Sequence, residues 1–269
     1  ECMTFQLIII GDEIIHGSRV DAHFSAIKTL LTERGLRLHS VQYLPDDRAL
    51  ITEQLKRSFA DGIPTFVTGG IGGTPDDHTR QAAAAALGLP LALHADAVPA
   101  IEAIAERRGE SLDNPNHLTR LNMATFPEGA DLVPNPYNNI AGFAMREHYF
   151  LPGFPVMAHP MVAWVLDTVY PHLHHQTRYA SVSVWVYNLP ESNITDMMQT
   201  IEAEHPHIQT FSLPSTLQAE HGSPYQYRIE FGLKAQDEAC NTLPAVWEQV
   251  LQQLQNMGGE LQTITTPSE

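Results

Sequence analysis

The chain has 269 residues, of which 43% are apolar, so it can bury enough surface for one large or two modest domains, and we expect two. Its 31 acidic side chains against 15 lysines and arginines give a net charge of −16, which argues against a nucleic-acid partner. The 2 cysteines have neither zinc nor disulfide spacing, and the apolar run Phe5 to Ile10 is far too short for a signal peptide or membrane span. We therefore expect a soluble, cytoplasmic protein with no membrane partner.

Strand and helix patterns alternate over the first ninety residues. The apolar run from Phe5 to Ile10 predicts a strand buried on both faces. Apolar residues at Val20, Phe24, Ile27 and Leu31 recur at helical spacing and predict the helix that follows. Two further strands are expected at 36–44 and 63–68, with a helix between them that Gly62 ends. Three β-α units in a row predict a mostly parallel sheet.

The most informative segment runs from Thr68 to His78 and reads Thr-Gly-Gly-Ile-Gly-Gly-Thr-Pro-Asp-Asp-His. We expect Thr74 to be the N-cap, with Pro75 first in the helix and Asp77 as the acid of a capping box. Free N–H groups and the helix dipole would favour a phosphate there. Because carboxylates stand where a P-loop has its lysine, a divalent cation is expected as well. The alternative, a plain glycine turn before a helix, stays open.

The remaining residues predict two more groups of elements. Residues 96–123 read as helices broken at Gly109 and Pro115, short strands follow at 131–133, 142–145 and 148–151, and an apolar helix spans 156–170. A polar segment at 171–175 then separates a second pattern. It comprises a strand at 179–187, a helix at 191–204, strands at 208–213 and 225–233, and a helix at 237–257. We predict domains at 3–171 and 178–262.

Four motifs occur in a fixed order along the first predicted domain. They are Gly-Asp-Glu-Ile-Ile-His-Gly from Gly11, the glycine segment from Thr68, Val-Pro-Asn-Pro from Val133 with Gly142-Phe143, and Leu-Pro-Gly-Phe-Pro from Leu151. With these motifs, residues 5 to 170 resemble the MoaB/Mog molybdopterin-binding domain, in particular the amino-terminal part of the CinA (competence/damage-inducible) proteins. The chain ends soon after Met257, so we expect the amidase domain of full-length CinA proteins, and its deamidation activity, to be absent.

The resemblance implies a three-layer α/β domain with a mostly parallel sheet, followed by a small α+β, KH-like domain. It also implies a phosphate-bearing ligand, either molybdopterin or a nucleotide, and an ADP-ribose pyrophosphatase activity that depends on Mg²⁺ or another divalent metal. Asp12 and Asp77 would be the catalytic and metal-binding carboxylates. The residues implied to bind the substrate or its phosphate are Thr68, Gly69, Gly70, Gly72, Gly73, Thr74, Asn135, Pro152, Gly153 and Pro155. Further candidates for the site are Glu13, Asp47, Asp76, His23 and His78.

Departures from the family pattern leave the substrate open. Met157 stands where CinA proteins usually have a glutamate, and Gly73 replaces the proline of Gly-Pro-Thr. The first hypothesis is a hydrolase or transferase acting on a phosphoanhydride, and the alternative is a non-catalytic binding or scaffolding module.

His16, His23 and His78 could act as general base or ligand, or form ordinary loop hydrogen bonds. Asp46 and Asp47 are expected to cap the helix after them.

The second predicted domain carries an excess of acid. Residues 178–262 hold three bases, Arg178, Arg228 and Lys234, against ten acids, and no basic Gly-x-x-Gly loop of the kind with which KH modules bind RNA. We expect a structural or dimer-forming module, so that the protein is a homo-oligomer whose only other partner is its small-molecule ligand.

Overall fold

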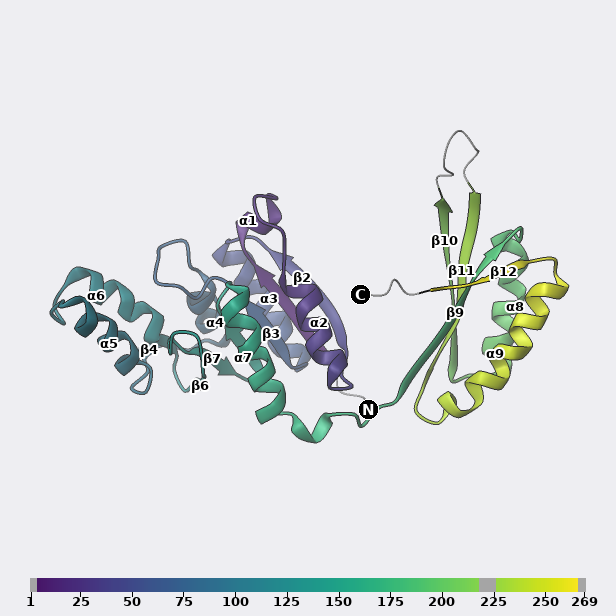
Figure 1. The fold of residues 1–269 in the computed structure, drawn as a ribbon. Helices are drawn as coiled ribbons and strands as arrows, with labels where there is room; N and C mark the ends of the chain where they lie inside the picture. Colours follow the sequence, from purple (N-terminus) through teal and green to yellow (C-terminus); the bar gives the residue numbers. More distant parts are fainter. Residues whose placement is uncertain (1–3, 218–225, 266–269) are drawn as a thin grey trace. The chain divides into compact units, whose positions relative to one another are not determined.

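The computed structural model describes residues 4–217 and 226–265, and Figure 1 shows the fold. The chain forms two compact units, Glu1–Gln176 and Thr177–Glu269. Within the described ranges, no helix is both long enough and apolar enough to cross a membrane. Each unit has its own hydrophobic core and is described separately below.

The first unit is built on a six-stranded sheet with the order β2-β1-β3-β8-β7-β6. Its strands are β1 (Phe5–Ile10), β2 (Leu38–Leu44), β3 (Thr65–Thr68), β6 (Asp131–Val133), β7 (Gly142–Met145) and β8 (His148–Leu151). The first four strands of that order are parallel, and β7 and β6 are antiparallel. A separate two-stranded sheet of β4 (Leu91–Leu93) and β5 (Thr125–Pro127) was not predicted.

Helices cover both faces of the six-stranded sheet. The helices of this unit are α1 (Asp12–Ile15), α2 (His23–Glu33), α3 (Arg48–Asp61), α4 (Thr79–Leu87), α5 (Val98–Arg108), α6 (Pro115–Arg120), the 3₁₀ turn η1 (Leu121–Ala124), α7 (Pro155–Thr168) and the 3₁₀ turn η2 (Pro171–Leu173). Leu7 and Ile9 of β1 pack with residues of α2 and α7, whereas Ile8 and Ile10 pack with residues of α3 and α4. Because alternate residues of one strand point to opposite faces, the unit has three layers, as predicted.

The start of α2 differs from the prediction. The helix begins at His23, and Val20, expected on its apolar face, is 88% exposed before it. The carboxylate of Asp21 accepts hydrogen bonds from the N–H groups of His23 and Phe24, at 2.7 and 3.2 Å. These bonds satisfy the first free donors of the helix and set its start three residues later than the apolar spacing indicated.

The second unit is an antiparallel sheet with the order β10-β11-β9-β12 and two helices. Its elements are β9 (Tyr179–Tyr187), α8 (Glu191–Glu204), β10 (Ile208–Leu217), β11 (Gln226–Gln236), α9 (Ala239–Asn256) and β12 (Glu260–Thr263). The core is formed by apolar residues of both helices and the sheet, such as Ile194, Phe231 and Val250. This α+β unit was predicted except for β12, whose sequence Glu-Leu-Gln-Thr has no strand pattern; its KH-like character stays a prediction.

Candidate functional site

A cavity of about 460 Å³ lies at the carboxyl ends of the parallel strands β1, β3 and β8. This is where open α/β sheets bind ligands. Of the residues predicted for the site, it is lined by Glu13, Gly69, Gly70, Gly72, Gly73, Thr74, Asp76, Asp77, Asn135, Pro152 and Gly153. The predicted residues outside the lining are Asp12, Asp47, Thr68, His23, His78 and Pro155.

The segment Gly69 to Gly73, called the glycine loop below, has three carbonyl groups that accept hydrogen bonds from the start of α4. The Gly69 carbonyl accepts from Thr79 Oγ1 at 2.9 Å, and the Gly70 carbonyl accepts from the Thr79 N–H at 3.0 Å. The Gly72 carbonyl accepts from the guanidinium of Arg80 at 2.5 Å. The N–H groups from Gly70 to Gly73 make no hydrogen bond to any residue in 4–217 or 226–265. Successive unpaired N–H groups in a concave loop are typical of anion sites.

Two of the glycines are required by the backbone. Gly69 and Gly70 have φ angles of +95° and +72°, a region that side chains disfavour. A Cβ on Gly69 would lie 2.1 Å from the Ile10 carbonyl oxygen, and one on Gly70 would lie 2.1 Å from Thr79 Oγ1. The glycine loop therefore passes directly against β1 and α4, which brings it to the edge of the cavity.

The predicted start of the helix after the glycine loop is wrong. Helix α4 begins at Thr79, so Thr74 is not its N-cap and Pro75 is not its first residue. Instead, the Asp77 carboxylate accepts from the N–H and the hydroxyl of Thr74, at 3.0 and 2.8 Å, and closes a turn. The local sequence has the chemistry of a capping box, but the bond from the Thr79 N–H to Gly70 delays the helix.

Asp46 is the pocket carboxylate where Asp47 had been proposed. Asp47 caps α3 by accepting from the Leu50 N–H at 3.0 Å, as predicted from its position. Asp46, expected to cap the helix too, lines the cavity instead and exchanges hydrogen bonds with Asp12: each N–H donates to the other carboxylate, at 2.9 and 3.0 Å. Burial, followed by the charges of Asp12 and two neighbouring acids, raises the pKa of Asp46.

The donors of the site fit a metal only if the ligand completes its shell. Among the described residues, no three His, Cys, Asp or Glu side chains are arranged to hold a metal ion. Glu13, Asp46, Asp76 and Asp77 nevertheless line the cavity. Mg²⁺ is commonly bound by one or two carboxylates plus the phosphates of a substrate, and this donor set fits that mode of binding.

His23 holds the cavity wall that includes Gly153, although His23 itself does not line the cavity. Its Nε2 lies 2.8 Å from the Gly153 carbonyl and must donate to it, so Nδ1 accepts from His159 Nε2 at 3.1 Å. Burial lowers the pKa of His23 and of His159, which favours this neutral pair. His78 instead accepts a hydrogen bond from Arg48 at 3.2 Å, and His16 is exposed.

Comparison with known proteins identifies the family. A family model described as a probable molybdopterin-binding domain matches residues 6–175. The chain belongs to this family. A CinA-like protein of Citrifermentans bemidjiense is 32% identical over 203 residues, which cover 73% of this chain and 47% of that protein. A CinA-like protein of a Geobacter species is 31% identical over 213 residues, covering 77% and 50%. The chain thus spans about half the length of these curated relatives.

Two further comparisons bear on length and fold. A protein of Aeropyrum pernix is 25% identical over 260 residues, which cover 95% of either chain. The solved structure of a CinA protein of unknown function from Thermoplasma acidophilum matches with a TM-score of 0.53 at 24% identity, over 62% of this chain and 98% of that one. The predicted CinA-like resemblance and the MoaB/Mog-like α/β fold are therefore confirmed.

The structure of this CinA-like chain adds site residues that the sequence did not reveal. Arg19 is the one basic side chain in the cavity lining within the described residues, and it comes from the irregular segment before α2. Phe154 and Met157 give the wall beyond Gly153 an apolar surface, and the Phe154 side chain is 57% exposed. A departure from the family pattern at Met157 was the available signal for that wall, whereas no pattern marked Arg19.

Proposed function

We propose that the protein binds a phosphate-bearing nucleotide or pterin in the cavity at the carboxyl ends of β1, β3 and β8. The observation that carries the proposal is the glycine loop: the carbonyls of Gly69, Gly70 and Gly72 are bonded to Thr79 and Arg80, while the N–H groups from Gly70 to Gly73 have no partner in the described chain. These groups match the needs of phosphate oxygens, and Arg19 supplies a positive charge at the same cavity. The apolar wall at Phe154 and Met157 suits a flat ring.

We further propose that the ligand carries a phosphoanhydride, as in ADP-ribose, and that the protein cleaves it with a divalent metal. Asp77 and Asp76, beside the glycine loop, would hold the metal together with the phosphates. A bound metal would neutralise developing charge and lower the pKa of a water molecule. Asp12, the other predicted ligand, is hydrogen-bonded to Asp46 and lies outside the lining, so its role is to position Asp46 at the cavity edge.

A second candidate is a binding module without catalysis. Two observations favour it: an apolar methionine occupies position 157, where the family usually has a glutamate, and the Asp12 carboxylate is already engaged by the Asp46 N–H at 2.9 Å. Such a module would retain the glycine loop and bind the same ligands.

Thermal denaturation with ADP-ribose, ATP, AMP or NAD, each with Mg²⁺ or with EDTA, tests both candidates. A bound ligand at about 100 times its dissociation constant adds roughly 2.7 kcal/mol of stability. Stabilisation with release of AMP supports the enzyme, and stabilisation without product supports the binding module. Failure of all four ligands to bind would contradict the phosphate site.

A variant at the cavity wall locates the binding. A Cβ on Gly153 would meet only the Gly69 Cα, at 3.5 Å, an ordinary contact that the fold can accept. Gly153→Ala therefore places a methyl group between the two walls without a clash. We expect it to keep its melting temperature and lose ligand affinity; unchanged affinity would place the ligand elsewhere.

A further inference from the structure

The side chain of Arg80 is buried without a carboxylate partner. It is 2% exposed, and no ion pair joins it to a carboxylate among the described residues. Its guanidinium donates to the carbonyls of Gly72, Asn122 and Thr125, and its Nε–H has no hydrogen-bond partner there. Burial lowers the pKa of Arg80, while the charge of Asp77 raises it.

A buried arginine of this kind needs compensation. A guanidinium stays charged at any physiological pH, so Arg80 cannot relieve the cost of burial by losing its proton. Carbonyl dipoles offset part of that cost, but an unpaired charge in the interior is normally balanced by an opposite charge. Two other arginines with largely buried side chains differ from Arg80, because each is paired with a carboxylate: Arg34 with Asp167 and Arg120 with Glu110.

The position of Arg80 links it to the glycine loop. Its guanidinium lies 2.5 Å from the carbonyl oxygen of Gly72, a residue that lines the cavity, although Arg80 itself does not. By holding that carbonyl inward, Arg80 leaves the N–H groups of the loop on the cavity side. Since the Gly72 carbonyl and the Gly73 N–H belong to one peptide unit, the charge also lies next to the backbone that carries those groups, in a buried region where electrostatic interactions are weakly screened.

We propose that Arg80 is a positioning residue that gives the glycine loop a positive electrostatic potential, as a lysine does in a P-loop. An anion of the phosphate class, bound to the loop N–H groups, would then balance the charge of the buried guanidinium. This inference rests on the proposed function, because it concerns the same anion. Arg80 acts through the loop and through its field, and does not itself touch the ligand.

Two substitutions separate its charge from its hydrogen bond. Arg80→Gln keeps an N–H donor for Gly72 but removes the charge, whereas Arg80→Lys keeps the charge. With inorganic pyrophosphate as the probe in calorimetry, we expect Arg80→Gln to weaken binding at least about tenfold, the size of a lost charge-assisted interaction. The loss should persist from about 0.05 M to about 0.5 M salt, since a buried charge is poorly screened.

The pH dependence of pyrophosphate affinity in Arg80→Lys distinguishes an electrostatic role of Arg80 from a purely structural one. A buried lysine can lose its proton as the pH rises, whereas arginine cannot. Arg80→Lys should therefore bind pyrophosphate about as well as wild type near neutral pH and approach Arg80→Gln at higher pH, when each is compared with wild type at the same pH. If Arg80→Gln and Arg80→Lys bind as tightly as wild type at every pH, the proposal is overturned.

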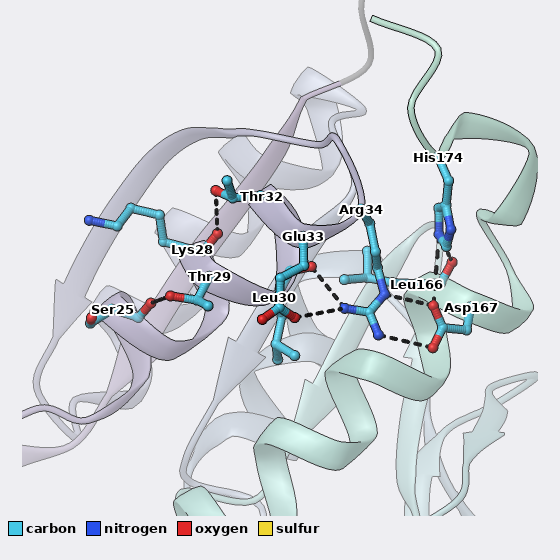
Figure 2. A network of polar contacts seen from close by, with 10 residues as sticks. All are labelled: Ser25, Lys28, Thr29, Leu30, Thr32, Glu33, Arg34, Leu166, Asp167 and His174. Atoms are coloured by element: carbon cyan, nitrogen blue, oxygen red, sulfur yellow. Dashed lines mark hydrogen bonds and ion pairs between the residues drawn. The ribbon is translucent and has the colours of Figure 1, made fainter. Parts of the chain in front are cut away.

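Arg34 offers a matched control, because Arg34→Met removes the same charge from a paired arginine (Figure 2). The Arg34 guanidinium binds both oxygens of Asp167, at 2.6 and 3.0 Å, and none of its partners lines the cavity. Arg34→Met should leave pyrophosphate affinity unchanged. A loss equal to that of Arg80→Gln would show a general charge effect and overturn the role of Arg80.

Wild-type protein decides the matter if the Arg80 variants do not fold. In a nitrogen–proton NMR titration with pyrophosphate, the Arg80 Nε–H signal should shift along the binding curve while that of Arg34 stays fixed; an unmoved Arg80 signal in a protein that binds pyrophosphate overturns the proposal. Wild type that binds neither pyrophosphate nor ADP-ribose would instead reject the proposed function itself.

Discussion

The stability of the first unit should fall in mild acid because of His148. This residue of β8 is 0% exposed, and its Nδ1–H donates to the Arg146 carbonyl at 2.9 Å. The Nε2 of the neutral ring then accepts the Ser58 hydroxyl at 2.6 Å, and the ring of Phe59 packs with its centroid 4.3 Å away. A protonated ring would bury a charge that no carboxylate in these contacts balances.

The sign and size of this change in stability with pH follow from the pKa of His148, which burial lowers from 6.5 to about 4. Between these values the unfolded chain binds a proton that the folded chain does not, so the contribution is fully present above pH 6.5 and is lost as the pH falls toward 4. The difference corresponds to about 3 kcal/mol in total, at roughly 1.4 kcal/mol per pH unit. Between about pH 7 and about pH 5 the loss should be about 2 kcal/mol.

The assay must report the first unit alone, because a chain of two units need not unfold in one step. Urea unfolding that is monitored by hydrogen–deuterium exchange of the β3 and β8 amides reports the first unit alone. We compare wild type with His148→Asn at several pH values. His23 and His159 also have lowered pKa values, but they titrate in both proteins and cancel in the difference.

His148→Asn should be less stable than wild type at pH 7 and should lose less of its stability on acidification. His172→Asn, at an exposed histidine of the same unit, controls for the substitution itself. Equal pH dependence of the wild type and His148→Asn would refute the assignment of His148 as a buried neutral histidine.

Three further predictions concern the cavity and the second unit. Asp77→Asn should lower the melting temperature slightly, because an amide replaces a carboxylate that accepts two hydrogen bonds from Thr74. The same substitution should weaken the Mg²⁺-dependent binding of ADP-ribose about tenfold or more. A lowered melting temperature with intact affinity would show that Asp77 only stabilises the turn. Arg19→Met should weaken pyrophosphate binding a few-fold at low salt. The effect should become smaller at high salt, because the Arg19 side chain is exposed and its charge is screened. Calorimetry at two salt concentrations checks this. The acid excess of residues 178–262 predicts no sub-micromolar binding of single-stranded RNA, and a gel shift at moderate salt would reveal any.

Much of the first unit could be predicted because its parallel strands are buried on both faces. Such strands are continuous apolar runs, and Phe5–Ile10 is the clearest example. Elements stabilised mainly by tertiary contacts gave no such signal. Strand β12 is a polar segment that pairs with the end of β9, and β4 and β5 have three residues each.

The candidate site was predicted as far as glycines and motifs could indicate it. The glycines indicated the loop because its backbone needs positive φ angles at Gly69 and Gly70, and the loop lines the cavity. Asp46 and Asp47 were harder to separate, since adjacent acids have the same chemistry and only the geometry of the N-cap assigns Asp47 to the helix. Arg80 could not be found, because an arginine in the first turn of an alanine-rich helix has the pattern of a surface residue.

The metal and Arg80, which we propose as sources of positive charge beside Arg19, have different consequences for ligand binding. Among the residues that the structure describes, four carboxylates and one cationic side chain, Arg19, line the cavity, so an anion would be repelled unless a metal or a buried charge compensates. A metal is removed by EDTA, whereas Arg80 is a fixed part of the core. Chelation should therefore weaken the binding of a diphosphate sharply but leave a residual affinity, and that residual affinity should disappear in Arg80→Gln. Metal would then be needed chiefly for tight binding and chemistry, while the glycine loop with Arg80 behind it selects the anion.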